Sequence, residues 1–180
     1  KDTLNEALKG KFRRFKGTQK KEDCNYFPKD LDELRDIIRS RVKSDPQCDL
    51  NDVWVGDIKE MDYLFRNSLF NGDISAWDVS NVRYMRAMFY NCPFNGDISY
   101  WNVSNVKSMY EMFMKSSFNG DISSWDVSNV KSMQWMFFES IFNDDISAWD
   151  TGNVNYMNGM FEGSLFNGDI SRWDTSSVKN

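Results

Sequence analysis

The sequence has no histidine, only three cysteines and only three prolines among its 180 residues. Histidine is the commonest general base and a frequent metal ligand, so its absence argues against most hydrolytic and metal-dependent enzymes. The cysteines at positions 24, 48 and 92 are too few for a disulfide framework and lack metal-binding spacing. No apolar run approaches the ~18 residues of a membrane-spanning helix, and no signal peptide is visible. We therefore expect a non-enzymatic protein without a cofactor and without a transmembrane segment.

The charge is distributed unevenly along the chain, whose formal net charge is -5. Residues 1–21 hold eight lysines and arginines against two carboxylates, so an acidic remainder follows a basic arm. One interpretation is that this arm contacts nucleic acid, an anionic membrane or an acidic protein. The other, which we favour, is a second capping helix or a tail lying on the acidic remainder. Nucleic acid is therefore not the partner we expect.

A 24-residue repeat occupies most of the chain. The stretch FNGDISAWDVSNV, residues 70–82, returns four more times in closely similar form. The repeat aligns five tryptophans: Trp77, Trp101, Trp125, Trp149 and Trp173. An earlier unit beginning near Leu50 follows the same pattern, with Val53 in place of tryptophan. A fixed period of this length is typical of a solenoid, in which each unit buries its apolar edge against its neighbours.

Within each unit the spacing of apolar residues changes. Trp77 and Val79 alternate with polar residues, which is typical of a strand. Residues of helical spacing then follow: Val82, Met85, Met88 and Phe89. Asn71-Gly72 is a turn sequence, because glycine accepts a positive φ. We predict a right-handed α/β solenoid with one short helix per unit and parallel strands about 4.8 Å apart.

The N-terminal end of this solenoid has a predicted cap. Asp30 and Glu33 form a capping-box pattern ahead of an apolar stripe, and Asp45-Pro46 stops the helix. The stripe consists of Leu31, Leu34, Ile38 and Val42. We divide the chain into a basic arm (1–25), a cap helix (26–48) and a solenoid (49–180) of five full units and a partial sixth. The last unit has no visible cap, so we expect further chain, a partner, or end-to-end association to cover it.

The repeat resembles a known family. Ile74, Trp77 and Val79 have the spacing of a leucine-rich-repeat strand, and MFYNC (88–92) is similar to a segment of BspA-like leucine-rich repeats. The phrase WDVSNV followed by MxxMF resembles the ~25-residue repeat of that family's mycoplasma-lipoprotein branch. The resemblance implies a surface or secreted protein that acts by binding or adhesion. Relatives in phages would instead imply an intracellular protein.

Methionines and aspartates also recur with the repeat. Nine of the ten methionines fall in two columns of the predicted helix, which indicates core packing rather than a copper site. The first acidic row follows the Asn-Gly turn: Asp73, Asp97, Asp121, Asp145 and Asp169. The second, with Asn102 in one unit, points outward: Asp78, Asp126, Asp150 and Asp174. We expect the first row to bond to turns and the second to shape a binding face. Neither matches a calcium-binding loop.

Binding should use positions that the repeat leaves variable. On the strand side these include Tyr100 and Arg172, beside the second acidic row. On the helix side, aromatic residues fall outside the core columns: Tyr110, Trp135 and Tyr156. Such residues are either anchors for a protein partner or shields for the rim of a thin solenoid. We predict a protein-binding scaffold, or alternatively a phage-type acidic decoy that inhibits a nucleic-acid-binding host protein. Pairing of Cys24 with Cys48 is left open.

Overall fold

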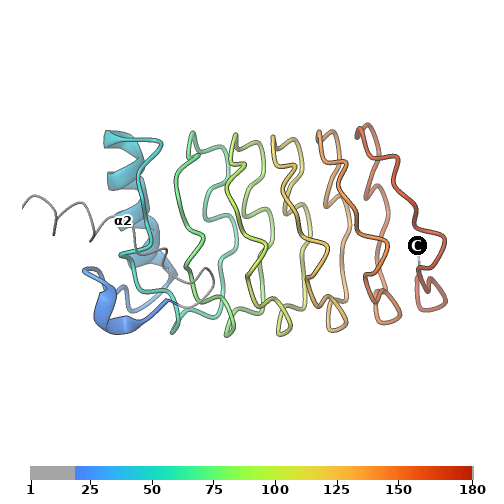
Figure 1. Cartoon of the computed structure of the whole chain (residues 1–180), viewed down its shortest axis with the longest axis horizontal. Helices are drawn as coiled ribbons and strands as arrows, with labels where there is room; N and C mark the ends of the chain where they lie inside the picture. The colour runs from blue at the N-terminus through green and yellow to red at the C-terminus, as the bar shows by residue number, and fades with distance from the viewer. Residues whose placement is uncertain (1–18, 180) are drawn as a thin grey trace, which may run out of the picture.

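The computed structural model describes residues 19–179 as a row of stacked coils with one α-helix at the N-terminal end (Figure 1). The helices are a 3-10 turn, η1 (Lys21–Asp23), and α2 (Leu31–Ser44). Each coil beyond them corresponds to one 24-residue unit. The repeat predicted from the sequence is therefore confirmed. Residues 1–18, which hold most of the predicted basic arm, lie outside the described residues.

Helix α2 lies against the first coil and covers its apolar edge. The Asp30 carboxylate accepts hydrogen bonds from the N–H groups of Asp32 (3.0 Å) and Glu33 (2.9 Å), which confirms the predicted N-cap. The Glu33 carboxylate accepts from the N–H of Lys29 instead of that of Asp30, so the box closes one residue earlier than expected. Leu34 and Ile38 are buried against the coil.

The predicted strand and helix of each unit are wrong for the described residues. Within residues 19–179 no strand forms, and the β pairing between successive coils consists of isolated parallel bridges, such as Tyr84 with Ser108. In the segment expected to be helical, Ala87 and Asn91 have φ values of 50° and 49°. A left-handed residue at every fourth position interrupts a right-handed helix. The chain therefore forms consecutive turns at this place in each coil.

The backbone hydrogen bonds of these turns run largely between coils. In one coil the donors are the N–H groups of Met85, Ala87, Phe89 and Asn91. The acceptors are the carbonyls of Ser108, Tyr110, Met112 and Met114 in the next coil, at 2.8–3.1 Å. Alternate peptide groups thus find partners in a neighbouring unit, as they do in a sheet.

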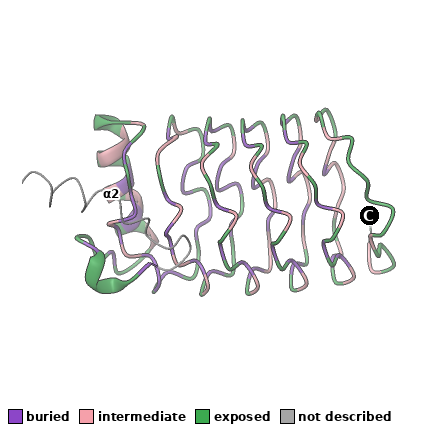
Figure 2. Cartoon of the chain, in the orientation of Figure 1, coloured by how far each residue is buried: buried purple, intermediate pink, exposed green. Residues whose placement is uncertain are grey.

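The core consists of stacked side chains from equivalent positions, and buried residues recur along the coils except in the last one, residues 166–179 (Figure 2). One column of phenylalanines stacks with ring centroids 5.5–5.8 Å apart: Phe65, Phe89, Phe113, Phe137 and Phe161. A second column stacks at 5.8–6.3 Å: Phe70, Phe94, Phe118, Phe142 and Phe166. The two methionine columns are buried beside them, apart from half-buried Met157, which confirms their packing role.

The tryptophan column adds a directional bond to this packing. The Trp77 indole N–H donates to the carbonyl of Leu50 (2.9 Å), and that of Trp125 to the carbonyl of Ile98 (3.1 Å). Each tryptophan thus binds the backbone of the preceding unit. A buried indole needs an acceptor for its N–H, and the stack supplies one in every unit. The predicted burial of the tryptophans is confirmed, with Trp173 in the last coil only half-buried.

Gly72 has a different role from the one predicted. Among the described glycines only Gly159 and Gly163 have a positive φ. A Cβ atom on Gly72 would lie 2.0 Å from the Cys48 carbonyl oxygen and 2.8 Å from the Phe70 ring. Glycine is therefore required here by close packing between adjacent coils.

Candidate protein-binding surfaces

Within residues 19–179, no cluster of three or more potential metal ligands was found. No helix in this same range has the length and apolar character needed to cross a membrane. All three cysteines are buried thiols that form no disulfide within residues 19–179, so Cys24 and Cys48 are not bonded to each other. Burial raises the pKa of Cys92 to about 11, which keeps this thiol protonated and unreactive at neutral pH.

The first acidic row bonds to turns, as predicted. In each of five units the aspartate Oδ1 accepts from the N–H two residues later, at 2.8–3.0 Å. These backbone bonds, with serine hydroxyls that donate to the same carboxylates, hold the pKa values of Asp121, Asp145 and Asp169 below the usual range. The charge of each carboxylate remains at the surface.

The second acidic row makes the same kind of turn. The Asp126 Oδ1 accepts from the Ser128 N–H at 3.0 Å, and the neutral Asn102 accepts equivalently from Ser104 at 3.2 Å. The turn therefore requires the side-chain oxygen but not the charge. Asp126, Asp150 and Asp174 are exposed, whereas Asp78 is half-buried. A carboxylate-to-amide change at these positions can remove charge while it preserves the turn.

We predict that millimolar Ca²⁺ leaves the melting temperature of the protein almost unchanged. The aspartate oxygens that face inward are already used by backbone N–H groups, and no described cluster offers the six to eight oxygens that Ca²⁺ prefers. Thermal unfolding with Ca²⁺ and with EDTA checks this. A rise of several degrees that EDTA reverses would contradict our assignment of the aspartates to turns.

The first candidate surface contains Tyr100 and Arg172, which occupy the same position in coils three units apart. Tyr100 is 63% exposed and Arg172 is exposed. Ala76, at the equivalent position of an earlier coil, is buried (3% exposed). The Gln19 Oε1 accepts from the N–H groups of Val55 (3.2 Å) and Asp78 (3.5 Å), so the N-terminal segment lies over this end of the surface.

The second candidate surface lies on the turns that replace the predicted helices, and it is an aromatic cluster around one arginine. The Arg66 guanidinium lies 5.5 Å from the centre of the Tyr63 ring and 4.3 Å from that of Tyr90. Tyr110 and Trp135 meet edge to face at 5.6 Å. We call these five residues the aromatic surface.

The environment of Tyr110 links the two halves of this surface. Burial, a hydrogen bond to the Glu111 carboxylate and the neighbouring Tyr63 raise the pKa of Tyr110 to about 12, while Arg66 opposes the shift. Tyr63 and Arg66 are thus close enough to influence Tyr110. Tyr156, the third residue predicted on this side, is 39% exposed but makes no ring contact with the pair within residues 19–179.

Sequence reasoning missed Tyr63, Arg66 and Tyr90. Tyr63 shares a position with Trp135, and Arg66 and Tyr90 share one with Phe138. The sequence therefore does show aromatic and charged residues varying at two positions of the repeat. We did not expect these two positions to form one surface, because a helix in each unit would not bring them together across coils.

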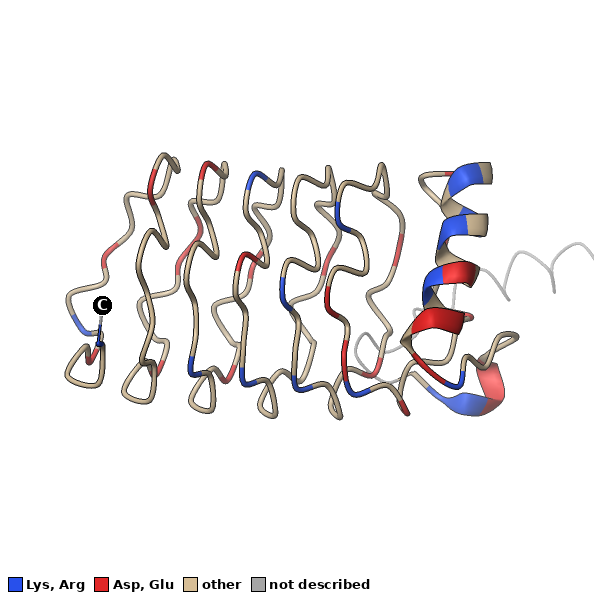
Figure 3. Ribbon diagram, turned by 180° about the vertical axis from the view of Figure 1, so that it is seen from behind, with Lys and Arg blue, Asp and Glu red and all other residues tan. Residues whose placement is uncertain are grey.

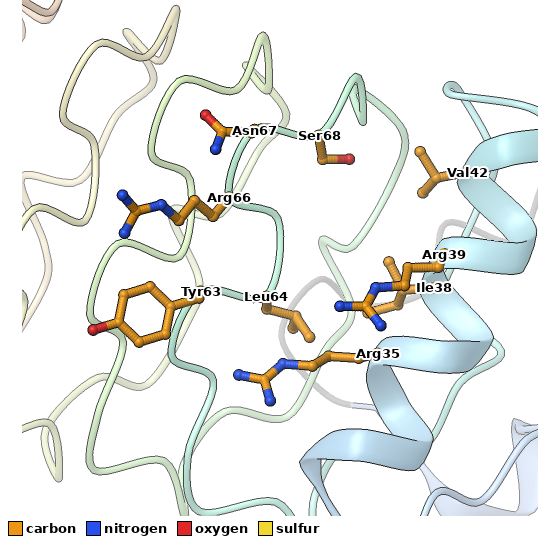
Figure 4. Close-up of a pocket in the computed structure, with 9 residues that line it drawn as sticks. All are labelled: Arg35, Ile38, Arg39, Val42, Tyr63, Leu64, Arg66, Asn67 and Ser68. Carbon is orange, nitrogen blue, oxygen red and sulfur yellow. The ribbon is translucent and has the colours of Figure 1, made fainter.

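A pocket of about 280 Å³ lies between α2 and the first coil, next to the aromatic surface. Arg35 and Arg39 extend from α2 toward the coil, and Tyr63 and Arg66 point away from the helix (Figure 4). The remaining lining residues are Ile38, Val42, Leu64, Asn67 and Ser68. Among the described residues that line the pocket there is no carboxylate. The aromatic surface therefore ends at a hollow whose α2 side holds two arginines, each ion-paired with an aspartate of the helix: Arg35 with Asp32 and Arg39 with Asp36.

The stacked 24-residue units and variable surface aromatics define a repeat protein. The chain belongs to the family described as "Mycoplasma protein of unknown function, DUF285", which it matches over residues 40–141 and again over 116–180. No curated protein and no solved structure gave a significant match. The mycoplasma repeat recognised in the sequence is therefore confirmed at the level of this family.

Proposed function

We propose that this protein is a non-enzymatic scaffold that binds a protein partner through the aromatic surface. The observation that carries the proposal is the contact of Arg66 with Tyr63 and Tyr90, next to the Tyr110–Trp135 pair. Tyrosine, tryptophan and arginine are the residue types most enriched at interface hot spots.

The arrangement of these side chains favours binding, because the side chains are already held in place before a partner binds. Tyr90, Tyr110 and Trp135 are partly buried and held by one another or by Arg66. Side chains ordered before binding lose less conformational freedom when a partner arrives. Packing of the core does not require them, because the phenylalanine and methionine columns already fill it.

The BspA-like resemblance adds a context to this proposal. BspA-like leucine-rich-repeat proteins are mostly surface or secreted adhesion modules, so we propose a cell-surface or secreted interaction role. The residues at the variable turn positions would then contact the partner, while the core residues stay the same from one unit to the next.

One observation favours a second candidate function, an acidic decoy for a nucleic-acid-binding protein. Asp126, Asp150 and Asp174 are exposed and in line, and bonds from serines lower the pKa values of Asp126 and Asp174. Such a row of ionised carboxylates imitates a phosphate backbone. In this case binding would depend steeply on salt.

We predict that Tyr90→Ala with Tyr110→Ala weakens the partner complex by about 2 kcal/mol or more, roughly a 30-fold rise in Kd. The partner is first identified by affinity capture and mass spectrometry, and affinities are then measured with purified proteins. The matched double variant is Tyr100→Ala with Arg172→Ala on the first surface, for which we expect the smaller loss. Both variants should keep the parent melting temperature within a few degrees.

Two other results would contradict this assignment. If only the Tyr100 and Arg172 variant loses affinity, the first surface is the binding site. If Asp126→Asn, Asp150→Asn and Asp174→Asn together abolish binding, the decoy function replaces the scaffold. These changes preserve the turns, because Asn102 already forms the same turn with a neutral side chain.

A further inference from the structure

A row of cations runs along the stack, separate from the aromatic surface. We call it the cation row; it consists of Lys59, Arg83, Lys107, Lys131 and Lys179, with Asn155 in the equivalent position of one coil. Lys107 and Asn155 are half-buried, and the other residues of the row are exposed. Figure 3 shows blue segments at a similar level on neighbouring coils, near their lower edge.

The backbone holds this row in a rigid line. Each residue's N–H donates to the carbonyl of the residue before it in the row: Arg83 to Lys59 (2.8 Å), Lys107 to Arg83 (2.8 Å) and Lys131 to Lys107 (2.9 Å). Asn155 and Lys179 continue the series at 2.9 Å. Backbones joined in this way lie about 4.8 Å apart, so neighbouring side chains leave the coils at close, regular intervals.

The charges of the row are not neutralised by the described part of the chain. The ion pairs within residues 19–179 use other cations: Lys21, Lys29, Arg35, Arg39, Arg41, Arg86 and Lys115. Lys107 and Lys131 instead donate to the Oδ1 atoms of Asn129 (3.3 Å) and Asn153 (3.2 Å). Like charges at this spacing repel one another. Stability does not require the charge, because Asn155 makes the same backbone bond without it.

We propose that the cation row binds an extended acidic segment of a polypeptide, laid across successive coils. The occupant is anionic because five of the six positions of the row carry an ammonium or guanidinium group. The occupant is also narrow, because acidic residues lie beside the row. Asp126 lies five residues before Lys131, and Asp150 lies five residues before Asn155, on the other side of the same turn. A wide polyanion, such as a nucleic acid duplex or a membrane, would contact this acidic row as well.

Single-stranded nucleic acid fits the row less well than a peptide. Proteins that bind it combine cations with aromatic rings on which successive bases stack. Tyr84 follows Arg83 and Tyr156 follows Asn155, but Ser108 and Ser132 stand between them in the same column, so successive bases would find no continuous series of rings. Carboxylates of an extended peptide need only the cations and the neighbouring asparagine amides. This inference concerns a different surface from the proposed function and does not depend on it.

The test uses labelled poly-L-glutamate as the probe and the full chain at low salt, where charges act over the longest range. Arg83→Gln, Lys107→Gln and Lys131→Gln together should weaken binding about tenfold or more, since each exposed charge pair contributes modestly. The melting temperature should stay the same or rise, because mutual repulsion is relieved. Asn155→Lys, which fills the gap in the row, should strengthen binding about threefold.

Matched controls separate the row from other sources of charge. Lys20→Gln, Lys29→Gln and Lys43→Gln change the net charge equally at exposed positions outside the row, and should retain most of the affinity. The Tyr90 and Tyr110 variant should bind the probe as the parent does. No binding by the parent, or an equal loss in both triple variants, would overturn the proposal. Tighter binding of an oligothymidylate of the same charge would overturn it in favour of single-stranded nucleic acid.

Discussion

Replacement of Trp125 by alanine is expected to lower the free energy of unfolding by about 3–5 kcal/mol, the range measured for buried large-to-small changes. Trp125 is 3% exposed in the middle of the stack. The substitution removes a ring that packs near Phe113 and a donor that bonds to the Ile98 carbonyl at 3.1 Å. Urea denaturation followed by circular dichroism measures the loss.

Trp125→Phe distinguishes the two parts of this effect. It keeps an aromatic ring but removes the indole N–H, which leaves a buried carbonyl without this donor at a cost of about 1–3 kcal/mol. We expect an intermediate stability, with faster amide exchange in the coils on both sides. Melting of the alanine variant within a degree or two of the parent would show that the tryptophan column does not hold the coils together.

The second large effect is expected from a single added methyl group. Gly72→Ala should destabilise the protein by about 3 kcal/mol, the upper part of the range for overpacking. The new Cβ would lie 2.0 Å from the Cys48 carbonyl oxygen, which belongs to the backbone of the preceding unit and cannot rotate away. Thermal and urea unfolding measure the change.

Gly152→Ala is the matched control for this prediction. A Cβ on Gly152 would meet only the Asp150 and Asp174 carboxylate oxygens, both at 3.4 Å, and its φ is not positive. We expect a change within about 0.5 kcal/mol, as at ordinary surface positions. Equal stability of the two variants would mean that the coils can separate locally at little cost.

The sequence predicts the period, the core columns and the cap helix well, because each depends on apolar residues at fixed spacing. The 24-residue step predicted which residues stack, and Asp30 predicted where α2 begins. The backbone path within a unit was not predicted. Apolar residues three or four positions apart fit a helix, but they fit consecutive turns equally well.

Left-handed residues decide between these two paths, and most of them are not glycine. The column that contains Gly159 holds Tyr63, Ala87, Glu111 and Trp135 in the other coils, all with positive φ. The left-handed conformation costs such residues free energy, and hydrogen bonds to adjacent coils offset this cost. The sequence of a single unit does not indicate that its residues adopt this conformation. The contact of Arg66 with Tyr90 was missed for the same reason, since it depends on how consecutive coils align.

The side-chain bonds that the repeated asparagine and tryptophan columns make between coils point one way along the stack. The Asn105 amide donates to the Ser80 carbonyl and that of Asn129 to the Ser104 carbonyl, as each indole does to the coil before it. Every interior coil therefore offers its successor the same acceptors that it uses in its predecessor. A duplicated unit would find its partners already in place. Gene duplication can thus lengthen the protein by whole coils, and each added coil brings new surface positions that are free to diverge.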